Sequence, residues 1–303
     1  MSEALSATAN AAEHVAPTSS EYIVHHLTHW QNKPQTEIVD FTVFNIDSLF
    51  FSILLGVVGS FFLWKAARKV TSGVPGRFQA AVEILFEMVN NQAKSIVHNP
   101  KSRQMVAPLA LTVFVWIFLL NAMDLLPLDL LPTIWAKIYG ATGHDPQHAF
   151  LRVVPTADLS VTMGLSVSVL FICLFYNMKI KGVGGWAHEL VTAPFGTSKN
   201  PIFAVILGVV NVAEQLISFV AKTVSHGMRL FGNMYAGELV FMLIALLGGS
   251  WALSMEPGSL ALLGLHIVAG WAWAVFHIII ILLQAFVFMM LTLVYIGQSH
   301  DAH

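Results

Sequence analysis

The chain has 303 residues, of which 56% are hydrophobic and only 11% are charged, against about 25% charged in an ordinary soluble domain. With a mean hydropathy of +0.71, this composition excludes a soluble globular protein, because too few polar side chains remain to cover a water-facing surface. The net charge of −2 excludes an extended basic surface for nucleic acid, and the single cysteine excludes an internal disulfide. We therefore predict a protein with several membrane-spanning helices.

Residues 1–44 are polar and form a predicted extramembrane tail. This tail lacks the basic start and the apolar core of a cleaved signal peptide. Three neighbouring histidines, His25, His26 and His29, could bind a metal ion, but no cluster of cysteines or carboxylates completes such a site. We interpret them instead as a solvated helix face, and we predict no bound metal or other cofactor.

The first predicted span and a different kind of helix follow the tail. The span, 46–66, contains 17 consecutive uncharged residues and ends on basic side chains that anchor it at the membrane surface. In the next segment, 76–98, apolar residues recur at helical spacing while Glu83, Glu87 and Lys94 fall on another side, which predicts an amphipathic helix. This helix either lies on the membrane face or docks a partner's helix, or it is a solvated connector packed on the protein itself.

Four more apolar segments complete the predicted membrane domain. Two of them, 104–126 and 158–178, each contain an uncharged run of 20 residues and are joined by a loop with several Gly and Pro residues. The other two, 201–247 and 258–298, are too long for upright helices, because about 40 helical residues measure roughly 60 Å against a hydrocarbon core of about 30 Å. We expect two strongly tilted helices that form one hairpin.

These elements predict an all-α, polytopic membrane protein with five membrane-crossing helices and one amphipathic surface helix, in a single membrane domain at 45–303. Seven of the 15 Lys and Arg residues lie between the first two spans, three follow the third span, and only one lies in the tail. By the positive-inside rule, the amphipathic segment and the loop 179–200 are cytoplasmic. The N-terminus is then outside and the C-terminus is cytoplasmic.

Arg229 lies deep within the apolar segment 201–247, where a guanidinium costs from about 2.5 to more than 10 kcal/mol. A functional role is favoured over structural pairing within the bundle, and both ends of the segment are too distant for the side chain to reach a membrane interface. Steps of three and four residues place further polar side chains on the same helix face: Gln215, Ser218, Lys222, Ser225 and Asn233. Glu238 falls on the opposite side of this helix, and Glu214 falls at the flank of the polar face.

The last apolar segment also carries polar groups on one face. His266, His277, Gln284 and Tyr295 are separated by intervals near multiples of 3.6 residues, which aligns them along the predicted helix. A single histidine there would more often be a packed core residue. Four aligned polar groups beside a helix that carries Glu238 favour a proton relay over simple packing.

Two acidic residues, Asp124 and Asp129, flank Pro127 at the end of the second predicted span. They are either carboxylates at the membrane interface or groups at the mouth of an aqueous path, and the sequence favours neither interpretation.

The sequence lacks the motifs of soluble enzymes: no phosphate-binding loop, no nucleophile elbow and no zinc-protease motif is present. We therefore predict that the protein has no catalytic site of its own. A haem-binding electron carrier would need axial histidines on facing helices, but His266 and His277 lie on the same one. The remaining alternative is a self-contained secondary ion transporter, which would show repeated halves and a midplane site.

Two long sequence strings resemble the signatures of one family. They are KTVSHGMRLFGNMYAGE at 222–238 and FHIIIILLQAF at 276–286, with shorter matches at 123–127 and 151–158. Together they resemble subunit a of bacterial F-type ATP synthases. The resemblance implies a proton-conducting stator in the inner membrane, with two offset half-channels that load and unload protons on a ring of c subunits. It also implies contacts with the b subunits of the peripheral stalk and with the lipid bilayer, and none with nucleic acid.

The resemblance also implies roles for individual residues. Arg229 matches the family's essential arginine, which faces the ring carboxylates. The outward half-channel is matched by Asn233, Glu238, His277 and Gln284, with Asp124 at its mouth. Further candidates for channel lining are Glu214, Gln215, Lys222 and Ser225. The chain departs from the family pattern at Glu214-Gln215, where an acidic position is shifted, and at His226, where we expect an apolar residue. The ring's ion site, on another chain, sets whether H+ or Na+ is carried.

Overall fold

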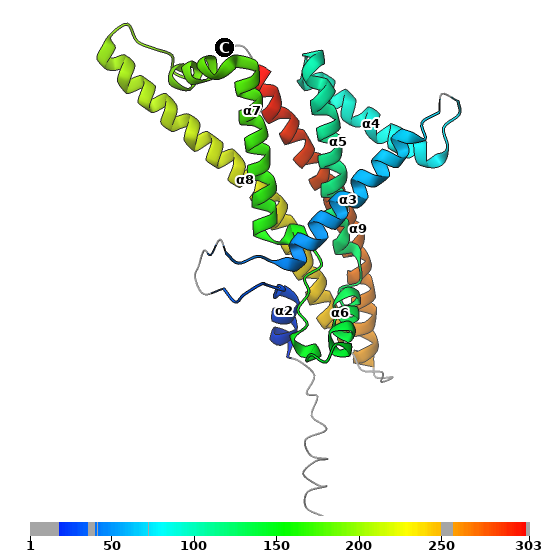
Figure 1. Cartoon of the computed structure of the whole chain (residues 1–303). Coiled ribbons are helices and arrows are strands. Elements are labelled where there is room, and N and C mark those ends of the chain that lie inside the picture. The colour runs from blue at the N-terminus through cyan, green and yellow to red at the C-terminus, as the bar shows by residue number, and fades with distance from the viewer. Residues whose placement is uncertain (1–17, 36–39, 41, 72, 250–256, 301–303) are drawn as a thin grey trace, which may run out of the picture.

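The computed structural model describes residues 18–35, 40, 42–71, 73–249 and 257–300 (Figure 1). This part of the chain contains five helices that are long and apolar enough to cross a membrane. They are α3 (Ile46–Arg68), α5 (Pro100–Ala122), α7 (Leu159–Thr192), α8 (Pro201–Gly249) and α9 (Pro257–Gly297). The prediction of an all-α protein with five membrane-crossing helices is therefore confirmed.

The amphipathic segment forms α4 (Arg77–Ile96), as its sequence pattern predicts. Val89 and Ala93 are buried in the core beside α5, whereas Glu83 is exposed on another side of the helix. The helix α4 therefore packs on the protein itself, which is one of the two alternatives that the sequence left open for this segment. The helix also exposes the large apolar side chains of Ile84 and Phe86, so a surface for lipid or for a partner remains.

Two predicted loops contain helices that sequence reasoning did not find. The loop after α5 contains α6 (Leu130–Ala141) and three short 3-10 turns, η1 (Met123–Leu125), η2 (Pro146–His148) and η3 (Pro155–Ala157). The predicted loop 179–200 is also wrong as far as Thr192, because a second helical stretch of α7 follows a kink at Gly182. Gly182 has φ of 72° and ψ of 158°, a non-helical backbone conformation that favours glycine, so the chain changes direction between two helical stretches.

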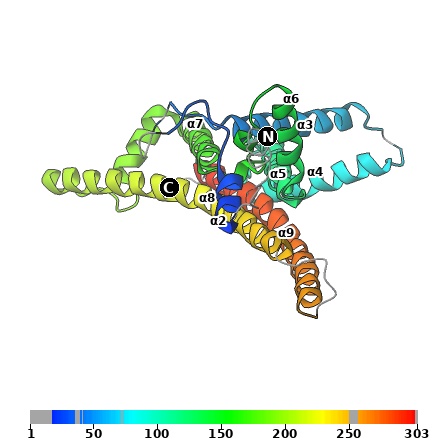
Figure 2. The ribbon, with the colours of Figure 1, turned by 90° about the horizontal axis from the view of Figure 1, so that it is seen from below.

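The two long segments form single helices, α8 and α9, that run antiparallel as the predicted hairpin (Figure 1). With 49 residues at about 1.5 Å each, α8 is roughly 73 Å long and must cross a bilayer obliquely. Seen from below, it runs along one whole side of the molecule (Figure 2). Only 11% of the most apolar stretch of α8 is buried, against 44% for α5. Most of α8 is therefore left for lipid or another subunit to cover.

The core lies where α5 packs against α9 and α7 packs against α8. Its fully buried side chains include Ile117, Leu120, Tyr176, Met289 and Leu293. Because lipid tails are as apolar as these side chains, close packing and polar contacts hold the bundle together more than the hydrophobic effect does. The polar residues described next lie within this packed interior.

Candidate functional site

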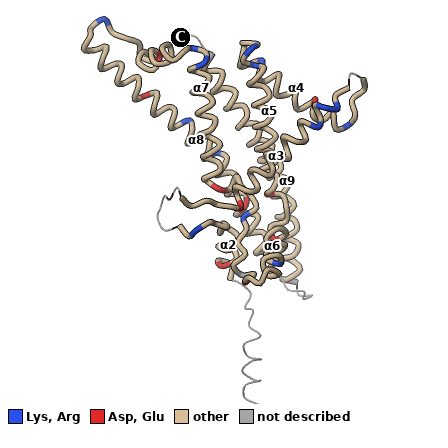
Figure 3. The backbone as a smooth tube through the Cα atoms, viewed as in Figure 1, with Lys and Arg blue, Asp and Glu red and all other residues tan. Residues whose placement is uncertain are grey.

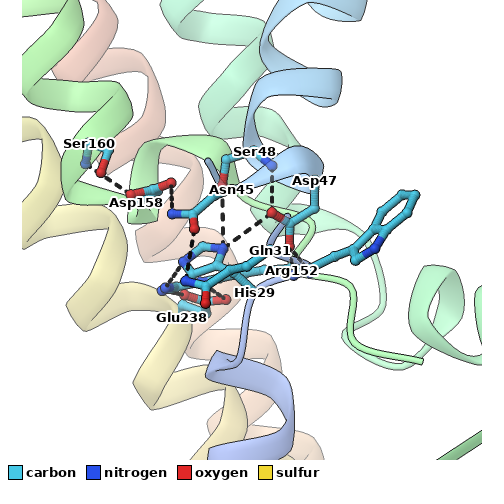
Figure 4. Close-up of polar contacts among 10 residues, drawn as sticks. His29, Gln31, Asn45, Asp47, Ser48, Arg152, Asp158, Ser160 and Glu238 are labelled. Carbon is cyan, nitrogen blue, oxygen red and sulfur yellow. Dashed lines mark hydrogen bonds and ion pairs between the residues drawn. The ribbon is translucent and has the colours of Figure 1, made fainter. Parts of the chain in front are cut away.

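A buried ion pair joins two distant parts of the chain. The guanidinium of Arg152 donates from Nη2 to Glu238 Oε2 at 2.5 Å and from Nε to Glu238 Oε1 at 3.4 Å (Figure 4). The two side chains are only 6% and 4% exposed. Glu238 belongs to α8 and Arg152 to the extended segment before η3. Because an unpaired charge is costly in such surroundings, each of these residues requires the other.

Asp47 fixes the backbone at Arg152. It lies in the first turn of α3, where the helix dipole favours a carboxylate. Its Oδ2 accepts hydrogen bonds from the backbone N–H of Arg152 at 2.9 Å and from that of Trp30 at 3.0 Å. Nearby, Asp158 caps α7 through the N–H of Ser160 and accepts a 2.7 Å hydrogen bond from Asn45. Segments before and after α3 are thus held together with the start of α7.

His29 completes what we call the Glu238 cluster, which consists of His29, Asp47, Arg152 and Glu238 (Figure 4). The imidazole Nε2 lies 3.1 Å from Arg152 Nη1, and Nδ1 lies 3.3 Å from Asp47 Oδ1. The predicted solvated helix face is therefore wrong for this residue. His29 lies beyond the end of α2 (Ser19–Leu27), and its side chain turns into the cluster instead of facing solvent.

His26 also departs from that prediction. Its Nε2 lies 3.0 Å from Asp129 Oδ1, which accepts a second hydrogen bond from the Tyr22 hydroxyl at 3.1 Å. Burial and the neighbouring carboxylate of Asp129 raise the pKa of the Tyr22 phenol. These contacts fasten α2 to the start of α6. Among the described residues, no group of three or more His, Cys, Asp or Glu is arranged to hold a metal ion.

A second buried pair lies deeper in the bundle. His277 Nε2 on α9 is 2.6 Å from Asp124 Oδ2 in η1, and neither side chain is more than 2% exposed. A cavity of about 20 Å³ is lined by His26, Asp124 and Glu238 among others, and this volume is enough for one water molecule. Gln284, two turns along α9 from His277, is also buried. Titratable groups therefore follow one another from the surface near Asp129 into the interior.

Gly237 permits the close approach of α8 and α9 beside this second pair. A methyl group added there would overlap the imidazole ring of His277. We expect Gly237→Ala to displace His277 from Asp124 and to destabilise the fold by about 1–3 kcal/mol, as overpacking of a filled core usually does. The measurement is the thermal unfolding midpoint of the purified protein. Gly264→Ala is the matched control, because that position of α9 has open space, and an equal loss in both variants would contradict this explanation.

Arg229 lies on the other side of α8 from Glu238, as the helical spacing predicts. Its side chain is exposed and forms no hydrogen bond or ion pair with any residue that the structure describes. Ser225 and Asn233, one turn to either side, are exposed as well. Apolar side chains of α8, among them Val224 and Met228, are exposed near this polar face. An unpaired guanidinium on a largely apolar membrane helix calls for a partner that the described residues do not supply.

A second polar space lies between α7, α8 and Gln298 after α9. These elements meet at the end of the bundle opposite α2 and α6 (Figure 1). We call this space the α7–α8 cavity; its volume is about 430 Å³. Its polar lining includes Glu214, Gln215, Ser218 and Lys222, which the helical spacing of the sequence places on or beside the polar face of α8. Glu189 and Gln298 complete this polar lining. Lys222 Nζ donates to Gln298 Oε1 at 3.2 Å. A smaller cavity of about 60 Å³ shares Lys222 and extends to the buried His226.

Sequence reasoning named Asp124, Glu238 and His277 but missed three members of the Glu238 cluster as site residues: His29, Asp47 and Arg152. In the sequence, Arg152 belongs only to the matched string 151–158. Its charge is the signal that could have marked it as a site residue, since it is one of only two basic residues between the second and third predicted spans. Its partner Glu238 is 86 residues away, so no local pattern could join them.

The fold and the site define a multi-pass membrane protein with a series of buried titratable groups and an exposed arginine in the middle of a long apolar helix. The sequence profile of the ATP synthase A chain family matches residues 49–297. The chain is similar to proteins named ATP synthase subunit a. It is 70% identical to that of Paracidovorax citrulli and 68% identical to that of an Acidovorax species, in both cases over 97% of this chain and 100% of the relative. It is 46% identical to that of Psychrobacter cryohalolentis, over 93% of this chain and 96% of the relative.

The chain therefore belongs to the ATP synthase subunit a family. This membership favours a component of a larger complex over the self-contained transporter that the sequence left as an alternative.

Proposed function

We propose that the chain is the proton-conducting stator subunit of an F-type ATP synthase, in which two offset half-channels load and unload protons on carboxylates of a ring of c subunits. The observation that carries this proposal is the exposed, unpaired Arg229 in the middle of an apolar helix. Polar groups lie on both sides of it along the bundle axis, the Glu238 cluster toward one end and the α7–α8 cavity toward the other.

Arg229 controls the charge of the ring carboxylates in this mechanism. A guanidinium about 4 Å from a carboxylate, at an effective dielectric constant of 20, attracts it with about 4 kcal/mol, equivalent to about three pKa units. A ring carboxylate that approaches Arg229 must therefore release its proton, and it takes up another after it moves away. The fixed positive charge also blocks direct proton flow between the half-channels. Each elementary charge that crosses 100 mV provides about 2.3 kcal/mol for rotation.

The outward half-channel consists of Asp124, His277, Gln284, Glu238 and Asn233 in this proposal. The 2.6 Å Asp124–His277 contact and the water-sized cavity between Asp124 and Glu238 support proton transfer between these groups. Asn233 is exposed on the same side of α8 as Arg229, at the position where a proton would reach the ring.

The cytoplasmic half-channel is the α7–α8 cavity. Its volume of about 430 Å³ can hold many water molecules, and Glu214, Gln215 and Lys222 supply polar lining. Ser225 lies between this cavity and Arg229 along the polar face of α8. Protons released at Arg229 then have an aqueous exit on this side.

The distribution of basic residues supports the proposed orientation. Most Lys and Arg residues lie toward the end of the molecule that contains α4 and the end of α7 (Figure 3). By the positive-inside rule this end is cytoplasmic, which puts the C-terminus inside and the N-terminus outside. The exposed apolar residues of α4, Ile84 and Phe86, offer a surface on which the b subunits of the peripheral stalk would pack.

A photo-crosslinking experiment tests the contact with the ring. A benzoylphenylalanine residue replaces Val224, which is exposed on α8 five residues before Arg229, in the assembled complex in native membranes. We expect illumination to link the chain to subunit c. The control places the same probe at Phe50 on α3, which is even more exposed, at 58% against 41% for Val224, but belongs to a helix that does not pack on α8. Equal linkage from both positions, or linkage from Phe50 alone, would rule out a ring on the α8 face.

A further inference from the structure

We infer that His29 is a positioning residue of the outward half-channel, whose neutral imidazole holds the Arg152 guanidinium in the orientation that pairs with Glu238. The inference rests on the proposed function, since it concerns how that half-channel is built. It adds a segment outside the family match, because residue 29 precedes the matched range 49–297.

The hydrogen-bond geometry selects one protonation state of His29. Every nitrogen of a guanidinium can only donate, so His29 Nε2, 3.1 Å from Arg152 Nη1, must accept. The ring proton then sits on Nδ1 and is directed at Asp47 Oδ1, 3.3 Å away. A protonated imidazole could not accept from Arg152, and two cations would face each other at this distance.

Each nitrogen of the Arg152 side chain has a defined partner. Nη1 donates to His29, whereas Nη2 and Nε donate to Glu238. Asp47 links the two residues, because one of its oxygens holds the Arg152 backbone and the other orients the imidazole (Figure 4). If His29 were apolar, Nη1 would be left without an acceptor in a buried site. The guanidinium would turn to find one, and its two hydrogen bonds to Glu238 would be disturbed.

Groups from three parts of the chain face the imidazole. They are Asp47 from α3, the hydroxyl of Ser48, Arg152 from the segment before η3 and, beyond the guanidinium, Glu238 from α8. The acceptor that Arg152 Nη1 requires is present only in the neutral ring.

Two substitutions in the whole complex test the role. Gln can accept from Arg152 and donate to Asp47, as the neutral imidazole does, whereas Leu can do neither. In inverted vesicles with equal amounts of assembled complex, we expect His29→Leu to lower ATP-driven proton pumping about fivefold or more, and His29→Gln to stay within about twofold of wild type. His98→Leu, at an exposed histidine near the end of α4, is the matched control and should pump as wild type.

Either wild-type rates in His29→Leu or a loss in His29→Gln as large as that in His29→Leu would overturn the positioning role. Normal pumping by an Arg229→Ala complex would instead overturn the proposed function itself.

Discussion

Replacing Arg229 by alanine is expected to abolish proton pumping while the complex still assembles. The side chain makes no hydrogen bond or ion pair with any described residue, so its removal costs the chain's own fold little. The ring carboxylates would lose about 4 kcal/mol of attraction that drives proton release, which corresponds to roughly a thousandfold in equilibrium. ATP-driven acidification of inverted membrane vesicles, compared at equal assembled complex, measures the effect, and we expect a loss of at least about 100-fold.

Arg229→Lys separates the shape of the cation from its charge. Lysine keeps a positive charge, but it is a flexible point charge that can lose its proton in an apolar site, whereas a guanidinium stays protonated. We therefore expect the Lys variant to fail as well. Wild-type pumping by either variant in a correctly assembled complex would make Arg229 a structural residue and would refute the mechanism.

The second large effect is expected at the buried ion pair. Arg152→Leu leaves the Glu238 carboxylate buried without its cation, and breaking a buried pair in this way typically costs about 3–5 kcal/mol. We expect a marked fall in the amount of assembled complex and in its thermal unfolding midpoint. The single variant should be worse than the double variant Arg152→Leu with Glu238→Leu, because the latter leaves no unpaired charge.

The double variant also distinguishes stability from function. Apolar residues in place of a buried ion pair are often neutral for folding, so assembly should recover. Pumping should not recover, since the outward half-channel loses its carboxylate. An Arg152→Leu complex as stable as wild type would show that the pair is dispensable for the fold, and pumping by the double variant would exclude Glu238 from the proton path.

The membrane helices could be predicted from sequence because their signal is local. Long apolar stretches with few or no charges located the five candidate spans of the described chain, and a turn of about 100° per residue correctly separated Arg229 from Glu238 on α8. The second helical stretch of α7 could not be predicted from the same signal. Lys179 and Lys181 end the apolar run, but a helix resumes after the kink at Gly182, and Lys181 forms an ion pair with Glu189 across that kink.

The Glu238 cluster could not be predicted in the same way. Asp47 contacts the backbone of a residue 105 positions away, and Arg152 pairs across 86 positions. Such contacts depend on how the bundle packs, and periodicity carries no information about that. The histidines near the N-terminus show the same limit. The polar sequence around them predicts solvent-exposed side chains, but in the fold His26 contacts Asp129 and His29 contacts Asp47.

The low burial of α8 has a consequence for the period before assembly. With 11% of its most apolar stretch buried, the helix that carries Arg229 is held only on one side by its own chain. In the proposed function, the polar groups at the two ends of the bundle are joined only by a carrier that the ring supplies. A newly inserted copy without a ring would then contain two blind passages and a positive charge between them. Such a copy would not conduct protons, so the membrane would remain impermeable to them until the ring has joined the complex.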